Sequence, residues 1–150
     1  MDGYTLDRAL STCPITRDVY RGVLPSDSPT SCRLTPGIYV YNTDESHQPG
    51  RHWVVQEREE GYMRHFDSYG LPPFGEMAKR LKKEGDACRI ISYRTRRLQG
   101  SGATCGYFCL YFTLYCVDSI KYPLTVFKPW DLEWNDTEVV RLTRQVFTGI

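Results

Sequence analysis

The longest apolar segment of the chain runs from Cys105 to Val117, with the sequence Cys-Gly-Tyr-Phe-Cys-Leu-Tyr-Phe-Thr-Leu-Tyr-Cys-Val. A segment of this length that is apolar on nearly every side is typical of a helix buried at the centre of a domain. It is far shorter than the roughly 20 residues that a membrane-spanning helix needs. The pattern therefore predicts a central buried helix that starts directly after the loop Gln99–Thr104.

Two strand patterns, His52–Glu57 and Tyr62–Asp67, lie upstream of this helix on either side of a hairpin turn at Glu59-Glu60-Gly61. Pairing the strands about a centre between the two glutamates places His52 opposite Asp67. The two Cβ atoms would then be about 5 Å apart on one face of the sheet. A carboxylate in that position orients an imidazole and selects its tautomer.

Shorter patterns predict the other elements, and together they indicate an α+β fold. The first 36 residues hold four prolines and read as a loop-rich entry to the domain. The next predicted elements are a helix at Leu6–Leu10, a strand at Ile38–Tyr41, a polar loop at Asp44–Gly50, a basic helix at Gly75–Gly85 and a strand at Arg89–Tyr93. The last predicted element is a helix that begins with the capping box Asn135–Glu138 and ends near Gly149. Its apolar face carries Val139, Leu142 and Val146. Helices before and after a small sheet, without strict alternation, are typical of the α+β class.

Length and composition fit one compact domain that covers residues 1–150. The chain is 41% hydrophobic and 25% charged, which is ordinary for a globular protein. Its net charge of +1 gives no global excess that would direct it to nucleic acid or to a membrane surface. Charged residues interrupt the first twenty positions, so no signal peptide is predicted, and we expect an intracellular protein that is not secreted.

The six cysteines are expected to be mostly free thiols, because a reducing compartment follows from the missing signal peptide. They include no CxxC pair, and Cys105, Cys109 and Cys116 fall on the predicted buried helix. Both features disfavour a structural zinc site, so the sequence predicts no metal ligands.

Cys105 is the candidate nucleophile, because it lies where a Gly/Ser-rich loop meets the start of the buried helix. Unpaired N–H groups and the positive end of the helix dipole favour a thiolate there. An isolated cysteine is more often a small buried hydrophobe, but one that follows a His/Asp hairpin indicates catalysis. Gly106 lets another chain approach closely. Gln99 can return over the loop and, with the Cys105 N–H, stabilise an oxyanion.

These motifs, in this order, resemble the adenovirus maturation protease (adenain) family, whose clan includes the Ulp-type deSUMOylating enzymes. The matching motifs are His52-Trp53, Phe66–Gly70, Gln99-Gly100 and Cys105–Cys109. The resemblance covers most of the chain. It implies an α+β cysteine protease fold, in which a small central mixed sheet packs on a buried helix that carries the catalytic cysteine at its N-terminus.

The resemblance also implies the function and its residues. The catalytic set would be Cys105, His52, Asp67 and Gln99, with Trp53 shaping the substrate-binding wall beside Gly106. The implied activity is a cysteine endopeptidase that cuts viral precursor polypeptides next to glycine during virion maturation, as a monomer in the virion and in the host nucleus or cytoplasm. No cofactor is required for this chemistry.

The chain departs from the adenoviral pattern in three respects. It is markedly shorter than adenoviral members, mostly between Asp67 and the final helix. Its acid stands in a Phe-Asp-Ser setting, which is closer to the Ulp-like side of the clan, and its charge is nearly balanced. These differences favour a related DNA virus or a virus-like mobile element.

Two features suggest activators. Cys88 lies eleven residues before Gln99, the spacing at which the family carries a cysteine that bonds an activating viral peptide, although an ordinary thiol at a strand start is the simpler interpretation. A basic run could contact DNA phosphates without sequence preference, although a solvated helix face is simpler. Its basic residues are Lys79, Arg80, Lys82, Lys83, Arg89, Arg94, Arg96 and Arg97.

Two other functions stay open at this point. A deubiquitinating or deSUMOylating protease that acts after Gly-Gly would share the same catalytic set. A non-enzymatic binding module is weakened by the competent side chains at all four catalytic positions.

Overall fold

The computed structural model describes residues 1–26, 35–43, 52–75, 77–79 and 90–150. Its centre is a five-stranded mixed sheet in the order β1-β2-β3-β4-β5. The middle pairs β2/β3 and β3/β4 are antiparallel, and the outer pairs β1/β2 and β4/β5 are parallel. The strands are β1 (Tyr20–Leu24), β2 (Gly37–Asn42), β3 (Trp53–Glu59), β4 (Tyr62–Phe66) and β5 (Ile90–Tyr93).

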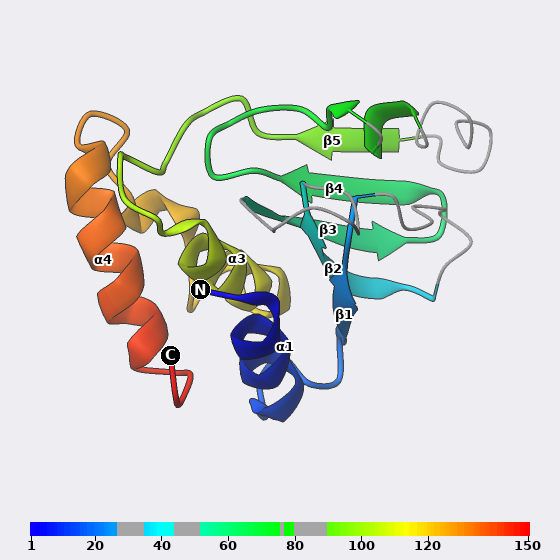
Figure 1. Cartoon of the computed structure of the whole chain (residues 1–150), viewed down its shortest axis with the longest axis horizontal. Coiled ribbons are helices and arrows are strands. Elements are labelled where there is room, and N and C mark those ends of the chain that lie inside the picture. Colours follow the sequence, from blue (N-terminus) through cyan, green and yellow to red (C-terminus); the bar gives the residue numbers. More distant parts are fainter. Residues whose placement is uncertain (27–34, 44–51, 76, 80–89) are drawn as a thin grey trace.

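Three helices gather on one side of this sheet, as Figure 1 shows. They are α1 (Gly3–Thr12), α3 (Cys105–Val117) and α4 (Leu132–Arg144), and a short 3-10 turn η1 (Leu124–Val126) precedes α4. Helix α3 packs against β3, α1 and α4 at the centre of the main apolar core. The Phe112 ring of α3 stacks on Phe66 at the end of β4, with 4.3 Å between the ring centroids. The nearly all-round apolar pattern of this segment thus corresponds to a central buried helix, as predicted.

The ends of two helices differ from the sequence prediction. Helix α1 is longer than Leu6–Leu10, because the Asp2 carboxylate caps it by accepting from the Thr5 N–H. Helix α4 begins at Leu132, ahead of the predicted capping box, and it ends at Arg144, before Gly149. The Asp131 side chain caps it by accepting from the Trp134 N–H. Asn135 and Asp136 of the predicted box are buried within the helix, and their side chains bond other segments instead.

The sheet contains one strand that the sequence analysis missed. Residues 20–24 were assigned to the loop-rich entry, but they form β1 and pair in parallel with β2. The strand is short and includes Gly22 beside an irregularity in the register, so its apolar alternation is weak. The strands predicted at Ile38–Tyr41 and Arg89–Tyr93 are present as β2 and β5, within one residue at each end.

The β3/β4 hairpin has a different register from the predicted one. Glu59 pairs with Tyr62, so the turn is the two-residue Glu60-Gly61. Gly61 has a φ of +69°, a conformation that glycine adopts without steric cost. The hairpin centre therefore lies one residue later than the centre between the two glutamates.

The corrected register explains how His52 and Asp67 still meet. Continued beyond the strand ends, it brings Tyr69, rather than Asp67, opposite His52. Side chains on a strand alternate between faces with a period of two. The error changes the partner of His52 by two residues, so Asp67 stays on the His52 face and reaches it diagonally.

Some predictions fall wholly or partly outside the described residues. These are the predicted loop at 44–50, most of the predicted basic helix, Arg80, Lys82, Lys83, Cys88 and Arg89. Within that helix, residues 75 and 77–79 are helical. In the part of the chain that the structure describes, no helix has the length and apolar character needed to cross a membrane.

Candidate active site

The imidazole of His52 and the carboxylate of Asp67 lie at the same end of the β3/β4 hairpin. His52 directly precedes β3, and Asp67 directly follows β4. His52 Nε2 is 2.7 Å from Asp67 Oδ1. Asp67 is 1% exposed, and its Oδ1 also accepts a hydrogen bond of 2.8 Å from the Tyr69 N–H. The buried carboxylate thus fixes Nε2 as the protonated nitrogen and leaves Nδ1 free to take up a proton.

Cys105 is the first residue of α3 and lies within interaction range of the same imidazole. Burial alone would raise the pKa of its half-buried thiol. Hydrogen bonds with His52 and with the Trp53 and Gly106 backbone, together with the His52 charge, outweigh burial and lower that pKa below its ordinary value of 9.0. The helix start adds to this effect, because the Thr104 side chain does not cap α3 and so leaves N–H groups near the sulfur.

The pKa of His52 moves in the opposite direction. Burial would lower it, but the hydrogen bonds and charges of Asp67 and Cys105 raise it from 6.5 to about 9. A lowered thiol pKa beside a raised imidazole pKa favours a thiolate–imidazolium pair at neutral pH. Such a pair is the reactive form of a cysteine nucleophile.

Gln99 is buried, and hydrogen bonds hold its side-chain amide at three points. Its Oε1 accepts from the Ser68 hydroxyl at 2.5 Å. Its Nε2 donates to the Gly102 carbonyl at 2.7 Å and to the Tyr69 hydroxyl at 3.4 Å. The last bond is long, so the same N–H can donate to a second acceptor as well.

The loop from Gln99 to Thr104 is held from the outside by α4. The Asp136 carboxylate accepts from the Gly100 N–H at 3.0 Å, the Gly102 N–H at 2.9 Å and the Thr104 hydroxyl at 2.7 Å. Both glycines pack closely against this carboxylate, since a Cβ added at either one would lie within 2.9 Å of an Asp136 oxygen. The Asp that was predicted to belong to a capping box therefore shapes the loop ahead of Cys105.

Trp53 and Gly106, predicted to bind substrate, both contact Met1. The Trp53 indole N–H donates to the Met1 carbonyl at 3.0 Å. A Cβ added to Gly106 would lie 3.1 Å from the Met1 side chain. Trp53 directly follows His52, and Gly106 directly follows Cys105. Met1 therefore covers part of the surface next to each member of this pair.

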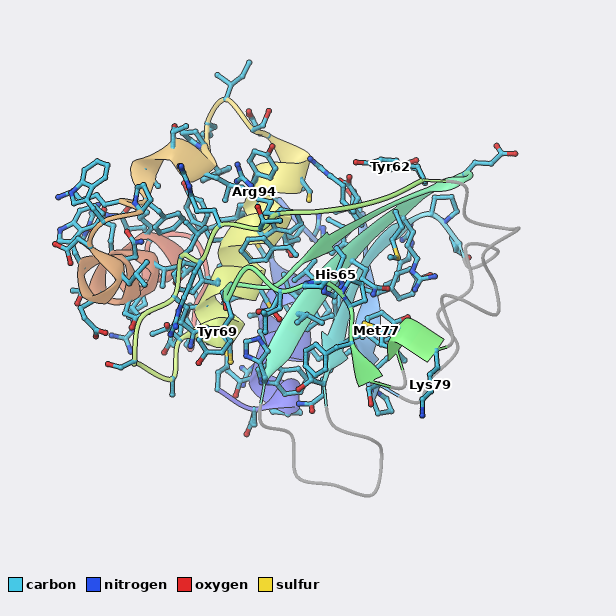
Figure 2. All side chains as sticks on the ribbon, turned by 90° about the horizontal axis from the view of Figure 1, so that it is seen from above. Tyr62, His65, Tyr69, Met77, Lys79 and Arg94 are labelled. Atoms are coloured by element: carbon cyan, nitrogen blue, oxygen red, sulfur yellow. The ribbon has the colours of Figure 1, made fainter. Side chains whose placement is uncertain are left out.

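The described basic residues do not form one patch. Figure 2 shows Lys79 and Arg94 well apart on the molecule. Arg94 and Arg96 are exposed and line a cavity of about 230 Å³ together with Trp130. Arg97 serves the site itself, because its guanidinium donates to the carbonyl groups of Gln99 and Gly100.

Comparison with known proteins supports the fold. No protein-family model and no curated protein sequence matches the chain. Among solved structures, the ASFV pS273R protease superposes with a TM-score of 0.61 at 14% identity. The match covers 97% of this chain and 66% of the length of that protease. This chain has the fold of that protease.

Two further solved structures match with TM-scores below 0.5. A second structure of the ASFV pS273R protease has a TM-score of 0.48 at 19% identity, and covers 75% of this chain and 45% of that one. The SUMO protease Ulp1, with its catalytic cysteine oxidised to a sulfinic acid, has a TM-score of 0.40 at 17% identity, with coverages of 75% and 54%.

Sequence reasoning missed four residues that build the site. Ser68 and Tyr69 hold Gln99 and His52, Asp136 holds the loop, and Arg97 was assigned to a DNA surface. Ser68 and Tyr69 directly follow Asp67, and this adjacency to a predicted catalytic residue was the signal that could have identified them. Asp136 lies more than thirty residues away from the loop, and its side chain gave no sequence signal for this contact.

Proposed function

We propose that the protein is a cysteine endopeptidase in which Cys105 is the nucleophile and His52 the general base. The observation that carries this proposal is the placement of one imidazole between a buried carboxylate, 2.7 Å away, and a thiol at the start of a buried helix. Asp67 would orient His52 and stabilise its charged form. Gln99 and the Cys105 N–H would contribute the oxyanion hole.

The geometry supports the following reaction. The Cys105 thiolate attacks the scissile carbonyl carbon, and the carbonyl oxygen takes up the negative charge. The Gln99 N–H that makes the long bond to the Tyr69 hydroxyl can also donate to this oxygen, as a three-centre bond. The imidazolium of His52 then donates its proton to the leaving amine, and an acyl-enzyme forms. Neutral His52 next removes a proton from water, whose hydroxide releases the carboxylic acid and restores the thiolate.

The substrates and partners are part of the proposal and rest on the family resemblance. We infer viral precursor polypeptides cut next to glycine, during virion maturation in the virion and the host nucleus or cytoplasm. An activating peptide at Cys88 and DNA at the basic residues remain predictions about the same enzyme. Both involve residues that lie partly outside the described ranges.

A peptide library tests the proposal directly. The purified chain is incubated with glycine-containing peptides, and cleavage sites are mapped by mass spectrometry. We expect wild type to cleave, and both Cys105→Ala and His52→Ala to lose activity while they stay folded. Cys116→Ala is the matched control, because it removes a half-buried thiol from the far end of the same helix.

Two outcomes would change the proposal. Turnover by Cys105→Ala at the wild-type rate would overturn it. Cleavage of a folded ubiquitin-like protein after Gly-Gly, without cleavage of the short peptides, would favour the deubiquitinating or deSUMOylating alternative.

A further inference from the structure

The ring of Tyr69 lies against the base of the candidate site. It stacks on the His52 imidazole with 4.7 Å between centroids and 23° between the planes. The Arg97 guanidinium lies 4.8 Å from the centroid of the same ring. The same imidazole interacts with Cys105, the first residue of α3. A stacked ring restricts rotation of the imidazole about its χ2 bond, whose torsional wells are broad when nothing packs on it.

The hydroxyl of Tyr69 lies against the candidate oxyanion donor. It accepts from Gln99 Nε2, while the neighbouring Ser68 hydroxyl donates to Gln99 Oε1. The Gly102 carbonyl, which can only accept, settles which end of the amide is nitrogen. The Ser68 carbonyl also accepts from the Gln99 N–H at 3.0 Å, so the turn after Asp67 holds both the backbone and the side chain of Gln99.

We propose that Tyr69 is a positioning residue that couples the base to the oxyanion donor. Its ring sets the plane of the His52 imidazole, and its hydroxyl, together with Ser68, keeps the Gln99 amide in one orientation. This inference rests on the proposed function, because it assigns work to Gln99 and His52 that only a hydrolytic site requires.

The same turn also orients the acid. The Tyr69 N–H donates to the Asp67 oxygen that faces His52. A second hydrogen bond closes the turn, because the Gly70 N–H donates to the Asp67 carbonyl at 2.8 Å. Four residues in a row, Asp67 to Gly70, therefore set the geometry of the acid, the base and the oxyanion donor. A displacement of this turn would move all three groups together.

Tyr69→Leu tests the ring, and Tyr69→Phe is its matched control because it keeps the ring. The readout is the pH dependence of Cys105 alkylation by iodoacetamide, mapped by mass spectrometry, which needs no substrate. In Tyr69→Leu the imidazole plane is released, so we expect alkylation at pH 6.5 to slow by about tenfold. In Tyr69→Phe the profile should match wild type.

Ser68→Ala and Tyr69→Phe test the amide. Both should lower kcat for peptide cleavage without changing KM or the alkylation profile, because the amide acts on the transition state. We expect about tenfold for Ser68→Ala, which leaves a buried acceptor unbonded, and about threefold for Tyr69→Phe, which loses only a long bond.

Three results would overturn the coupling role. The first is a wild-type alkylation profile in a folded Tyr69→Leu, and the second is an unchanged kcat in both Ser68→Ala and Tyr69→Phe. The third is a fall in alkylation rate and in kcat that is equally large in Tyr69→Leu and Tyr69→Phe. If wild type cleaves no peptide, the proposed function fails, while the alkylation profiles still decide whether Tyr69 positions His52.

Discussion

Asp67→Asn removes the charge behind His52 while it moves almost no atoms. Oδ1 of Asp67 accepts from both the Tyr69 N–H and His52, so the variant must keep an oxygen at that position. The new amide nitrogen then takes the place of Oδ2, a buried atom with no hydrogen-bond partner among the described residues. His52 keeps its neighbour and its tautomer but loses its counter-charge. The unbonded amide should also lower the free energy of unfolding by about 1–3 kcal/mol.

The pKa of His52 sets the size of the effect. Asp67 and Cys105 overcome burial and raise this pKa from 6.5 to about 9. That rise corresponds to about 3 kcal/mol, since one pKa unit is about 1.4 kcal/mol. Asp67 contributes the largest part of this rise and burial opposes it, so the pKa of His52 in the variant should fall below the wild-type value of about 9. We expect kcat/KM at pH 7 to fall by about 10- to 100-fold.

Two measurements check this expectation. An NMR titration of the His52 ring reports its pKa in both proteins, and a cleavage assay reports kcat/KM. In wild type the imidazolium should persist up to about pH 9, and in the variant it should lose its proton at lower pH. Glu60→Gln is the control, because it removes one negative charge from the exposed turn at the other end of the hairpin. An unchanged His52 pKa and an unchanged rate in Asp67→Asn would refute the reasoning.

Three further predictions concern stability. Asp136→Ala removes three hydrogen bonds from the loop before Cys105, so chemical denaturation should show a loss of about 2–4 kcal/mol together with reduced cleavage. Gly70→Ala places a Cβ 2.8 Å from backbone atoms at a φ of +74°, and should cost about 2–4 kcal/mol. Gly61→Ala, at a φ of +69° in open space, should cost about 1 kcal/mol, and equal losses would contradict this argument. Burial lowers the pKa of His65 from 6.5 to about 4. As the pH falls, the imidazole of His65 is therefore protonated in the unfolded chain before it is protonated in the folded protein. The free energy of unfolding should drop by about 3 kcal/mol between pH 6.5 and 4, and His65→Gln should remove this drop.

Local patterns in the sequence were enough to predict the contact between His52 and Asp67 and most of the elements. The apolar run from Cys105 to Val117 has no polar side, and only a central position can bury such a helix. His52 and Asp67 flank a short hairpin, whose turn brings strand ends together whatever the remainder of the chain does. The face that they share depends only on the two-residue period of a strand, so it survived an error in the turn.

The surroundings of the pair required the tertiary structure. Asp136 reads as a helix cap from its neighbours, but α4 packs on α3 and carries its carboxylate to the Gln99–Thr104 loop. Strand β1 is weakly patterned and forms because β2 offers it an open edge. Such contacts join residues far apart in the chain, and no local propensity encodes the distance between them.

The sequence by itself thus determined which groups are candidates for reaction, because the proposed nucleophile, base and acid are set by residue type and by short-range periodicity. Only the tertiary structure decided how they are held. The stack of Tyr69 on His52, the three hydrogen bonds on the Gln99 amide and the contact of Met1 with Trp53 all depend on where separate elements pack. Reactivity follows from the thiol and imidazole themselves, whereas their orientation follows from long-range packing, which a single sequence does not reveal.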